Sequence, residues 1–172
     1  MLLLDYMDEG ALEKKEWWLF LTDNQRDLLR QSVTLLNREK VFKEELFQDY
    51  SFIVFPAAKA YEGFLKKLLY DLGFITQAQY SGEHFRIGKS LNPNLPVRYR
   101  KSDWVYLKLE GYCRNKNIAS LLWEVWKKSR NHIFHWFPQH EGFVTLKEAE
   151  EHINMIVHVI DQTFTECRLD NR

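Results

Sequence analysis

The residue types best suited to chemistry lie close together in the second half of the chain, where Arg130, Asn131 and His135 interrupt a strongly aromatic stretch. A charged group among core-forming residues needs a partner or a purpose, so this cluster marks a candidate site. The imidazole of His135 can move a proton near neutral pH, and the planar guanidinium of Arg130 matches the oxygens of a phosphate. The amide of Asn131 can orient the same phosphate. Together these residue types indicate acid–base chemistry at a phosphodiester without a metal ion.

The spacing of these residues decides whether they can act on one group. On a regular α-helix, Asn131 and His135 are about one turn apart and share a face, whereas Arg130 lies about 140° away from His135. A position at the end of the helix, just before Pro138, would let the long arginine side chain converge with the imidazole. Two other roles stay open, namely a structural ion pair for Arg130 and a hydrogen-bonded core position for His135.

A carboxylate elsewhere in the chain has the surroundings of a site residue. Glu62 follows Pro56 in a segment of small and aromatic residues, where an isolated negative charge is costly. The carboxylate therefore needs a cation from an adjacent helix, and we expect Arg130 or His135 to supply it.

The elements that must position these residues are expected to be helices. Thr22 with Gln25, and Thr145 with Glu148, have the spacing of capping boxes, which predicts that a helix begins at each. A central helix should contain Pro56 either as a kink or as a break into two pieces. The expected helices cover 22–40, 48–72, 103–113, 117–138 and a stretch that begins at 145. The predicted fold class is therefore all-α, a helical bundle of four to five helices.

A long loop over residues 76–102 contains glycines and prolines that break regular structure. Its charge is one-sided, because five cations face Glu83 as the opposing charge. Cations hold phosphates and aromatic rings stack on bases, so this basic loop is a candidate RNA contact, and the alternative is a solvated surface loop. The candidate RNA-binding residues are Arg86, Lys89, Arg98, Arg100 and Lys101.

Length and composition favour one globular domain. With 172 residues, of which 45% are hydrophobic and 28% charged, the chain can bury a single core. Aromatic residues reach 15%, which favours a subunit interface and hence a homodimer. Basic and acidic residues number 24 each, so nucleic-acid binding must come from a local basic patch. No run of the sequence approaches the roughly 20 apolar residues of a membrane span.

The cysteines and histidines predict neither a metal site nor a cofactor site. Cys113 and Cys167 form neither a disulfide framework nor a metal knuckle, which suits a reducing cytosol and a cytoplasmic protein. His132, His135 and His140 lack the spacing and the neighbouring ligands of known metal sites. We therefore expect chemistry by side chains alone.

Three segments together give the chain a family resemblance: residues 55–71, the loop 87–93, and Arg130-Asn131 followed by His135. They resemble the HEPN superfamily of ribonucleases, and in particular the C-terminal HEPN domain of the RnlA/LsoA-type toxins of the RNase LS family. The similarity covers residues 48–167, which would form the core of a single HEPN-like domain over 1–172. Residues 1–47 would be an N-terminal helical extension.

The resemblance implies a function and a set of site residues. These toxins are metal-independent endoribonucleases, dimeric through the HEPN domain and silenced by a cognate antitoxin protein, and some answer phage infection. By motif, Arg130 and His135 would be the catalytic pair and Glu62 an acidic active-site residue. Asp49 matches a further acidic position, but on a continuous helix it would lie about 20 Å from Glu62. It would join the site only if Pro56 bends the chain or a second subunit supplies it.

We therefore predict a metal-independent RNA endonuclease that cleaves through the ribose 2′-hydroxyl, the toxin of a prokaryotic toxin–antitoxin or antiphage system. The alternative is a non-catalytic HEPN-like helical module that binds nucleotide, RNA or a protein partner, because one fold hosts several functions. The two differ in whether Arg130 and His135 converge in solvent or are buried against Glu62.

Overall fold

The computed structural model describes residues 9–42, 46–135, 138 and 142–169, and every regular element within these ranges is helical. The helices are α1 (Glu9–Glu13), η2 (Glu16–Phe20), α2 (Asp23–Val41), α3 (Ser51–Asp71), α4 (Gln77–Ser81), α5 (Ile87–Ser90), η3 (Val97–Tyr99), α6 (Tyr106–Tyr112), α7 (Ile118–Trp126), η4 (Lys127–His132) and α8 (Leu146–Glu166). Of these, η2 and η3 are 3-10 helices and η4 is a π-helix. The prediction of an all-α helical bundle is confirmed, but the described residues form more helices than the four to five expected, because short helices also occur before α2 and between α3 and α6.

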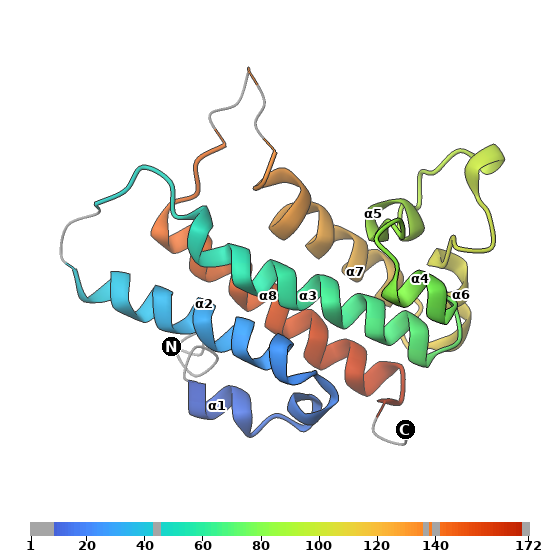
Figure 1. The fold of residues 1–172 in the computed structure, drawn as a ribbon, viewed down its shortest axis with the longest axis horizontal. Helices are drawn as coiled ribbons and strands as arrows, with labels where there is room; N and C mark the ends of the chain where they lie inside the picture. Colours follow the sequence, from blue (N-terminus) through green and yellow to red (C-terminus); the bar gives the residue numbers. More distant parts are fainter. Residues whose placement is uncertain (1–8, 43–45, 136–137, 139–141, 170–172) are drawn as a thin grey trace.

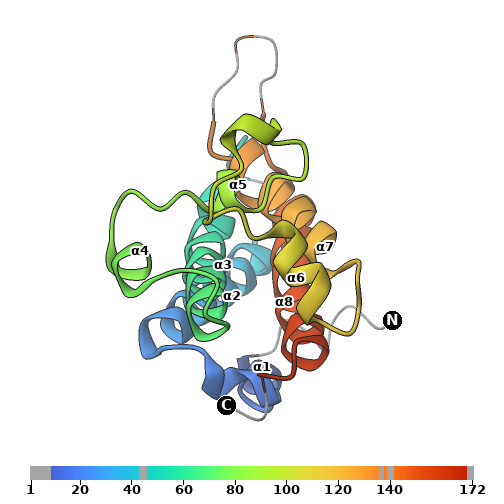
Figure 2. The ribbon, with the colours of Figure 1, turned by 90° about the vertical axis from the view of Figure 1, so that its right-hand side faces the viewer.

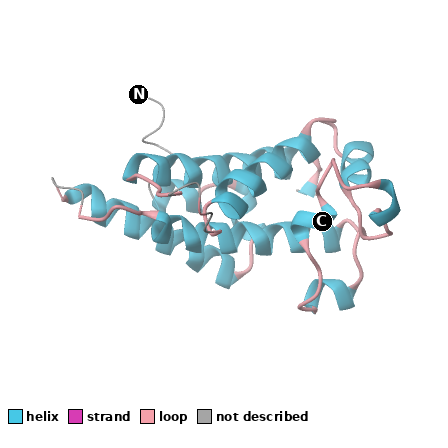
Figure 3. Cartoon of the chain, turned by 90° about the horizontal axis from the view of Figure 1, so that it is seen from above, coloured by secondary structure: helices cyan, strands magenta, loops and turns pink. Residues whose placement is uncertain are grey.

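The bundle is built from α2, α3, α7 and α8, which run along the long axis of the molecule (Figure 1). α3 is antiparallel to α2 and runs in the same direction as α8, whereas α7 points the opposite way and continues into η4. α3 contacts α2, α8 and η4, and α7 packs on α8. The short helices α4, α5 and α6 gather where α3 ends (Figure 2). Seen from above, helices and their connecting loops account for the whole described part (Figure 3).

A single hydrophobic core joins buried residues from Leu12 to Leu169, so the helices before residue 48 belong to the same packed unit as the rest. α3 contributes fully buried side chains such as Tyr61 and Phe64 to its centre. The Tyr61 hydroxyl donates a hydrogen bond to the carbonyl of Leu122 at 2.9 Å, which ties α3 to α7. Among the described helices, none combines the length and the apolar character that a membrane span requires.

Two helix starts that were predicted from local sequence are confirmed. Thr22 and Gln25 form a reciprocal capping box at the start of α2, and Thr145 and Glu148 form another at the start of α8. The short helix expected from about residue 103 exists as α6, but it begins later, at Tyr106.

α3 continues through Pro56, so the predicted alternative of two separate pieces is wrong. A proline inside a helix removes a backbone donor and crowds the carbonyl of the preceding turn. The buried hydroxyl of Ser32 on α2 supports this turn, because it donates to the carbonyl of Ile53 at 2.6 Å and accepts from the amide of Ala57 at 2.9 Å. A side chain of the neighbouring helix therefore strengthens α3 where Pro56 weakens it.

The cysteines are paired, contrary to the sequence-based prediction. Cys113 follows α6, Cys167 follows α8, and the two form a disulfide with their Cα atoms 4.3 Å apart. Beside the disulfide, the amide of Arg114 donates to the carbonyl of Glu166 at 2.9 Å. The ends of the two helices are thus joined both covalently and by a backbone hydrogen bond.

Candidate active site

The segment that carries the arginine–histidine motif changes its helix type just before the motif. α7 ends at Trp126 and continues as the π-helix η4, and His135 follows in a bend. The predicted regular helix to near Pro138 is therefore wrong beyond Trp126. A π-helix has i→i+5 hydrogen bonds, and short π-helical turns are frequent at functional sites. The separation of about 140° expected for Arg130 and His135 on an α-helix does not apply to this geometry.

Both motif residues line one cavity of about 380 Å³ between α3 and the motif segment. The lining consists of Phe55, Ala58, Lys59, Glu62, Arg130, Phe134 and His135. The α3 residues recur at helical spacing, so they form one stripe that faces the motif segment. The structure thus brings Arg130, His135 and Glu62 together at one place.

One end of the cavity is ionic. Nη2 of Arg130 lies 3.5 Å from Oε2 of Glu62, which confirms the prediction that Glu62 takes a cationic partner from this segment. The guanidinium also lies over the indole of Trp126, with 5.1 Å between Cζ and the ring centroid. The side chains of Arg130 and Glu62 are 36% and 34% exposed, so the ion pair is open to solvent. The guanidinium is therefore held in place and remains accessible to a ligand.

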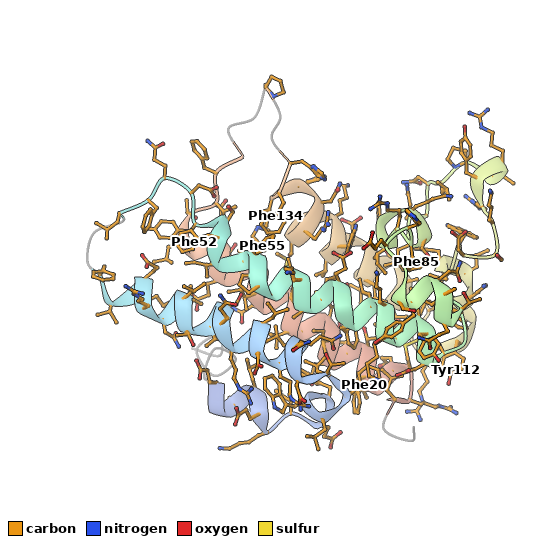
Figure 4. The ribbon with its side chains drawn as sticks, viewed as in Figure 1. Phe20, Phe52, Phe55, Phe85, Tyr112 and Phe134 are labelled. Atoms are coloured by element: carbon orange, nitrogen blue, oxygen red, sulfur yellow. A yellow bond between two sulfur atoms is a disulfide. The ribbon has the colours of Figure 1, made fainter. Side chains whose placement is uncertain are left out.

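The other end of the cavity is aromatic. The rings of Phe55 and Phe134 meet edge to face with their centroids 5.4 Å apart, and Nζ of Lys59 lies 5.7 Å from the centroid of Phe55. Figure 4 shows these two rings near Phe52, at the end of the bundle where α3 begins. Because Phe55 and Glu62 are separated by seven residues of one helix, the aromatic and ionic ends are about 10 Å apart.

The remaining predicted catalytic residues lie in different settings. His135 is exposed and lines the cavity, whereas Asn131 is partly buried and is not among the lining residues. Oδ1 of Asp49 accepts hydrogen bonds from the amides of Ser51 at 3.0 Å and Val144 at 3.1 Å. These bonds tie the start of α3 to the segment before α8. Asp49 does not line the cavity.

Sequence reasoning missed four residues of the cavity: Phe55, Ala58, Lys59 and Phe134. Lys59 and Phe55 precede Glu62 by three and seven residues, which places them on the same face of a helix. This spacing was a usable signal once Glu62 had been selected. Phe134 directly precedes His135 and was assigned only to the aromatic helix.

Trp126 supports the site although it does not line the cavity. It is 5% exposed, as expected for a core tryptophan, and the guanidinium of Arg130 lies over its ring. Trp126 also packs against α5, because a Cβ placed on Gly88 would lie 2.9 Å from Nε1 of the indole. A residue larger than glycine at this position would push against the indole that supports Arg130.

The basic loop is separate from the cavity. It lies toward the end of the bundle where α3 ends, and none of its five predicted RNA-binding residues lines the cavity. Arg100 holds the loop together, because its guanidinium donates to the carbonyl of Leu95 at 2.7 Å and lies 4.3 Å from the ring centroid of Trp104. The exposed cations are Arg86, Lys89, Arg98 and Lys101.

A second cavity of about 260 Å³ lies between η4 and the start of α8, and its lining includes His132 and His152. Oγ of Ser129, a buried residue of η4, lies 3.1 Å from Nδ1 of His152 on α8. Burial lowers the pKa of His152, and the negative charge of Glu148 partly opposes this shift. Within the described ranges, no group of three or more His, Cys, Asp or Glu is arranged to hold a metal ion, and His140 lies outside those ranges.

Comparisons with known proteins do not assign a family. No protein-family model matches the chain, and no solved structure matches it. The chain is similar to an argininosuccinate synthase from Ehrlichia canis (strain Jake), with 28% identity over 139 residues that cover 75% of this chain and 34% of that protein. It thus spans about a third of the length of this relative. At this identity and coverage, function has to be argued from the cavity.

Proposed function

We propose that this protein is a metal-independent RNA endonuclease that cleaves by attack of a ribose 2′-hydroxyl on the adjacent phosphate. The observation that carries the proposal is that Arg130, Glu62 and His135 line one solvent-accessible cavity. The reaction requires a group that moves a proton and a fixed cation that stabilises the charge developing on the phosphate. The cavity offers both groups.

In this reaction the 2′-oxygen forms a bond to phosphorus, and the bond between phosphorus and the 5′-oxygen breaks. The products are a 2′,3′-cyclic phosphate and a 5′-hydroxyl. The 2′-hydroxyl loses a proton and the 5′-oxygen gains one. His135 moves the proton at one of these two oxygens, solvent water exchanges the proton at the other, and Arg130 stabilises the phosphorane through charge-assisted hydrogen bonds. Glu62 holds Arg130 from α3, and Asn131 stays a candidate for orienting the phosphate. Asp49 has no step in this mechanism, because its hydrogen bonds serve the start of α3.

The assembly and the biological context of the proposal come from the resemblance to HEPN toxins. We propose a homodimer in which the motif segments of two subunits approach each other. A cytoplasmic location rests on the resemblance alone, because the disulfide between Cys113 and Cys167 removes the support that the cysteines gave it in the sequence. Its partners would be an RNA substrate and a cognate antitoxin protein. The system would be a prokaryotic toxin–antitoxin or antiphage system.

An RNA-cleavage assay in the presence of EDTA tests the proposal with wild type, His135→Ala and His132→Ala. His132 is an exposed histidine of the same segment that lines the second cavity instead, so it provides a matched control. We expect wild type and His132→Ala to release 2′,3′-cyclic phosphate ends. His135→Ala should be slower by about a hundred- to ten-thousand-fold, the usual contribution of general acid–base catalysis.

Two outcomes would contradict the proposal. Equal cleavage by wild type and His135→Ala would remove the catalytic role of the histidine. Binding of RNA or nucleotide by a wild-type protein that cleaves nothing would favour the non-catalytic HEPN-like helical module, with Arg130 serving only to bind phosphate.

A further inference from the structure

Exposed phenylalanines continue the aromatic end of the cavity along the start of α3. Phe52 and Phe55 are 39% and 49% exposed, and they lie three residues apart on one face of the helix. Phe47, which is 50% exposed, meets Phe52 edge to face with 5.4 Å between ring centroids. Phe55 meets Phe134 in the same manner. Clustered aromatic rings in contact with water mark a binding surface.

Cations border this aromatic surface on its cavity side. Lys59 lies over the ring of Phe55, and Arg130 stands at the ionic end of the same cavity. Lysine is depleted in protein–protein interfaces. Cations beside exposed aromatic rings are the combination that binds single-stranded nucleic acid, because the cations track phosphates and the rings stack on bases. Charge complementarity therefore favours a nucleic-acid strand over a protein as the occupant of this surface.

We propose that Phe55 and Phe52 form a stacking platform for bases of single-stranded RNA that lie about three nucleotides from the scissile phosphate. This inference rests on the proposed function, because it takes the ionic end of the cavity as the place of the scissile phosphate. The stretch of α3 from Glu62 to Phe55 is about 10 Å long, which corresponds to about three bases at the stacked rise of roughly 3.4 Å each. The ammonium of Lys59 lies over the ring of Phe55 and would contact a phosphate that links these bases.

A binding assay tests the platform independently of cleavage. The probe is a fluorescent 2′-deoxy oligonucleotide, which lacks the attacking hydroxyl, and the readout is fluorescence anisotropy. We expect Phe55→Leu to weaken binding about tenfold, and a variant that also carries Phe52→Leu to weaken it further. Phe55→Trp keeps an aromatic face and should retain the affinity. Tyr112→Leu is the matched control, because Tyr112 is 42% exposed on α6, outside the platform.

An abasic oligonucleotide shows whether the lost affinity is lost stacking. Removing the base that lies about three nucleotides from the central phosphate should weaken binding to wild type. The same abasic site should not weaken binding to Phe55→Leu further, because the substitution and the abasic site remove the same stacking contact. If removal of the base weakens binding to wild type and to Phe55→Leu by the same factor, the platform is overturned.

Cleavage kinetics separate this inference from the proposed function. If Phe55→Leu cleaves normal and abasic RNA with the wild-type KM, the platform is refuted while the endonuclease stands. If wild type cleaves no RNA but Phe55→Leu still loses affinity for the oligonucleotide, the platform stands and the endonuclease is refuted. If the oligonucleotide does not bind, and Phe55→Leu turns a wild-type dimer into a monomer, the surface is a protein interface and the platform is overturned.

Discussion

The ion pair between Arg130 and Glu62 allows a structural role to be separated from a catalytic one. Its atoms Nη2 and Oε2 are 3.5 Å apart, and the side chains are 36% and 34% exposed. A pair this exposed contributes roughly 0–1 kcal/mol to the free energy of unfolding. The contact of the guanidinium with Trp126 adds up to about 1 kcal/mol. We therefore expect Arg130→Ala to lower the free energy of unfolding by less than about 2 kcal/mol, which leaves a typical domain folded.

The effect of Arg130→Ala on cleavage should be larger than its effect on stability. Loss of one preorganised donor at the transition state costs about a hundred- to a thousandfold in rate, or about 2.7–4 kcal/mol. Single-turnover cleavage of a fluorescent RNA in EDTA measures this loss, and urea unfolding of the same samples measures stability. Glu62→Gln should cost less than Arg130→Ala, because it keeps both the guanidinium and an acceptor oxygen.

A double variant shows how Glu62 acts. If the carboxylate works by positioning the guanidinium, Arg130→Ala combined with Glu62→Gln will cleave no more slowly than Arg130→Ala alone. Fully additive losses would mean that Glu62 has a role of its own. If a folded Arg130→Ala protein cleaves RNA at the wild-type rate, Arg130 does not stabilise the phosphorane and the assignment is refuted.

Three further predictions concern the loop, the disulfide and the second cavity. Arg98 and Lys101 are exposed, so changing both to Glu should make RNA binding less sensitive to salt. The slope of log binding constant against log salt concentration should become shallower by about 0.7 for each lost phosphate contact. An unchanged slope would mean that the loop is a solvated surface. The disulfide of Cys113 and Cys167 spans 54 residues, for which the chain-entropy model gives about 4 kcal/mol. Urea unfolding with and without a reductant measures this loss, and Cys113→Ser combined with Cys167→Ser should not respond to the reductant. Burial lowers the pKa of His152, so the unfolded chain binds more protons than the folded protein between the two pKa values. The free energy of unfolding should therefore fall as the pH drops below about 6.5, and His152→Gln should have a flatter pH profile.

Helix starts could be predicted from the sequence because both partners of a capping box lie within one turn. Thr22 with Gln25, and Thr145 with Glu148, needed no knowledge of the tertiary structure. The continuity of α3 through Pro56 could not be predicted in this way. The supporting hydroxyl of Ser32 comes from another helix, and no local pattern reports such a contact.

The candidate site was partly predictable for a related reason. A carboxylate among apolar residues requires a cation, and together with the motif this requirement predicted Arg130 or His135 as the partner of Glu62. The structure pairs Glu62 with Arg130. The π-helical turn was not predictable, because the expected positions of the motif side chains assumed the angle of a regular α-helix. The pairing of Cys113 with Cys167 depends on where α6 and α8 end in space, which the spacing of two cysteines does not reveal.

The two segments that line the cavity, α3 and the motif segment, share a further property: beside the cavity, each lacks the uninterrupted hydrogen-bond pattern of an α-helix. α3 contains Pro56 next to Phe55, and the motif segment contains the π-helix η4. At each of these places a neighbouring helix supplies a hydrogen-bond partner. Ser32 of α2 bonds to the backbone of α3 beside Pro56, and His152 of α8 contacts Ser129 of η4. Neither α2 nor α8 contributes a residue to the lining of the cavity. Functional sites are where sequences break local rules, and the surrounding structure must then hold the irregular geometry. α2 and α8 therefore help to set the position of the two segments, and a substitution at Ser32 or His152 that slows cleavage is to be interpreted as a loss of positioning.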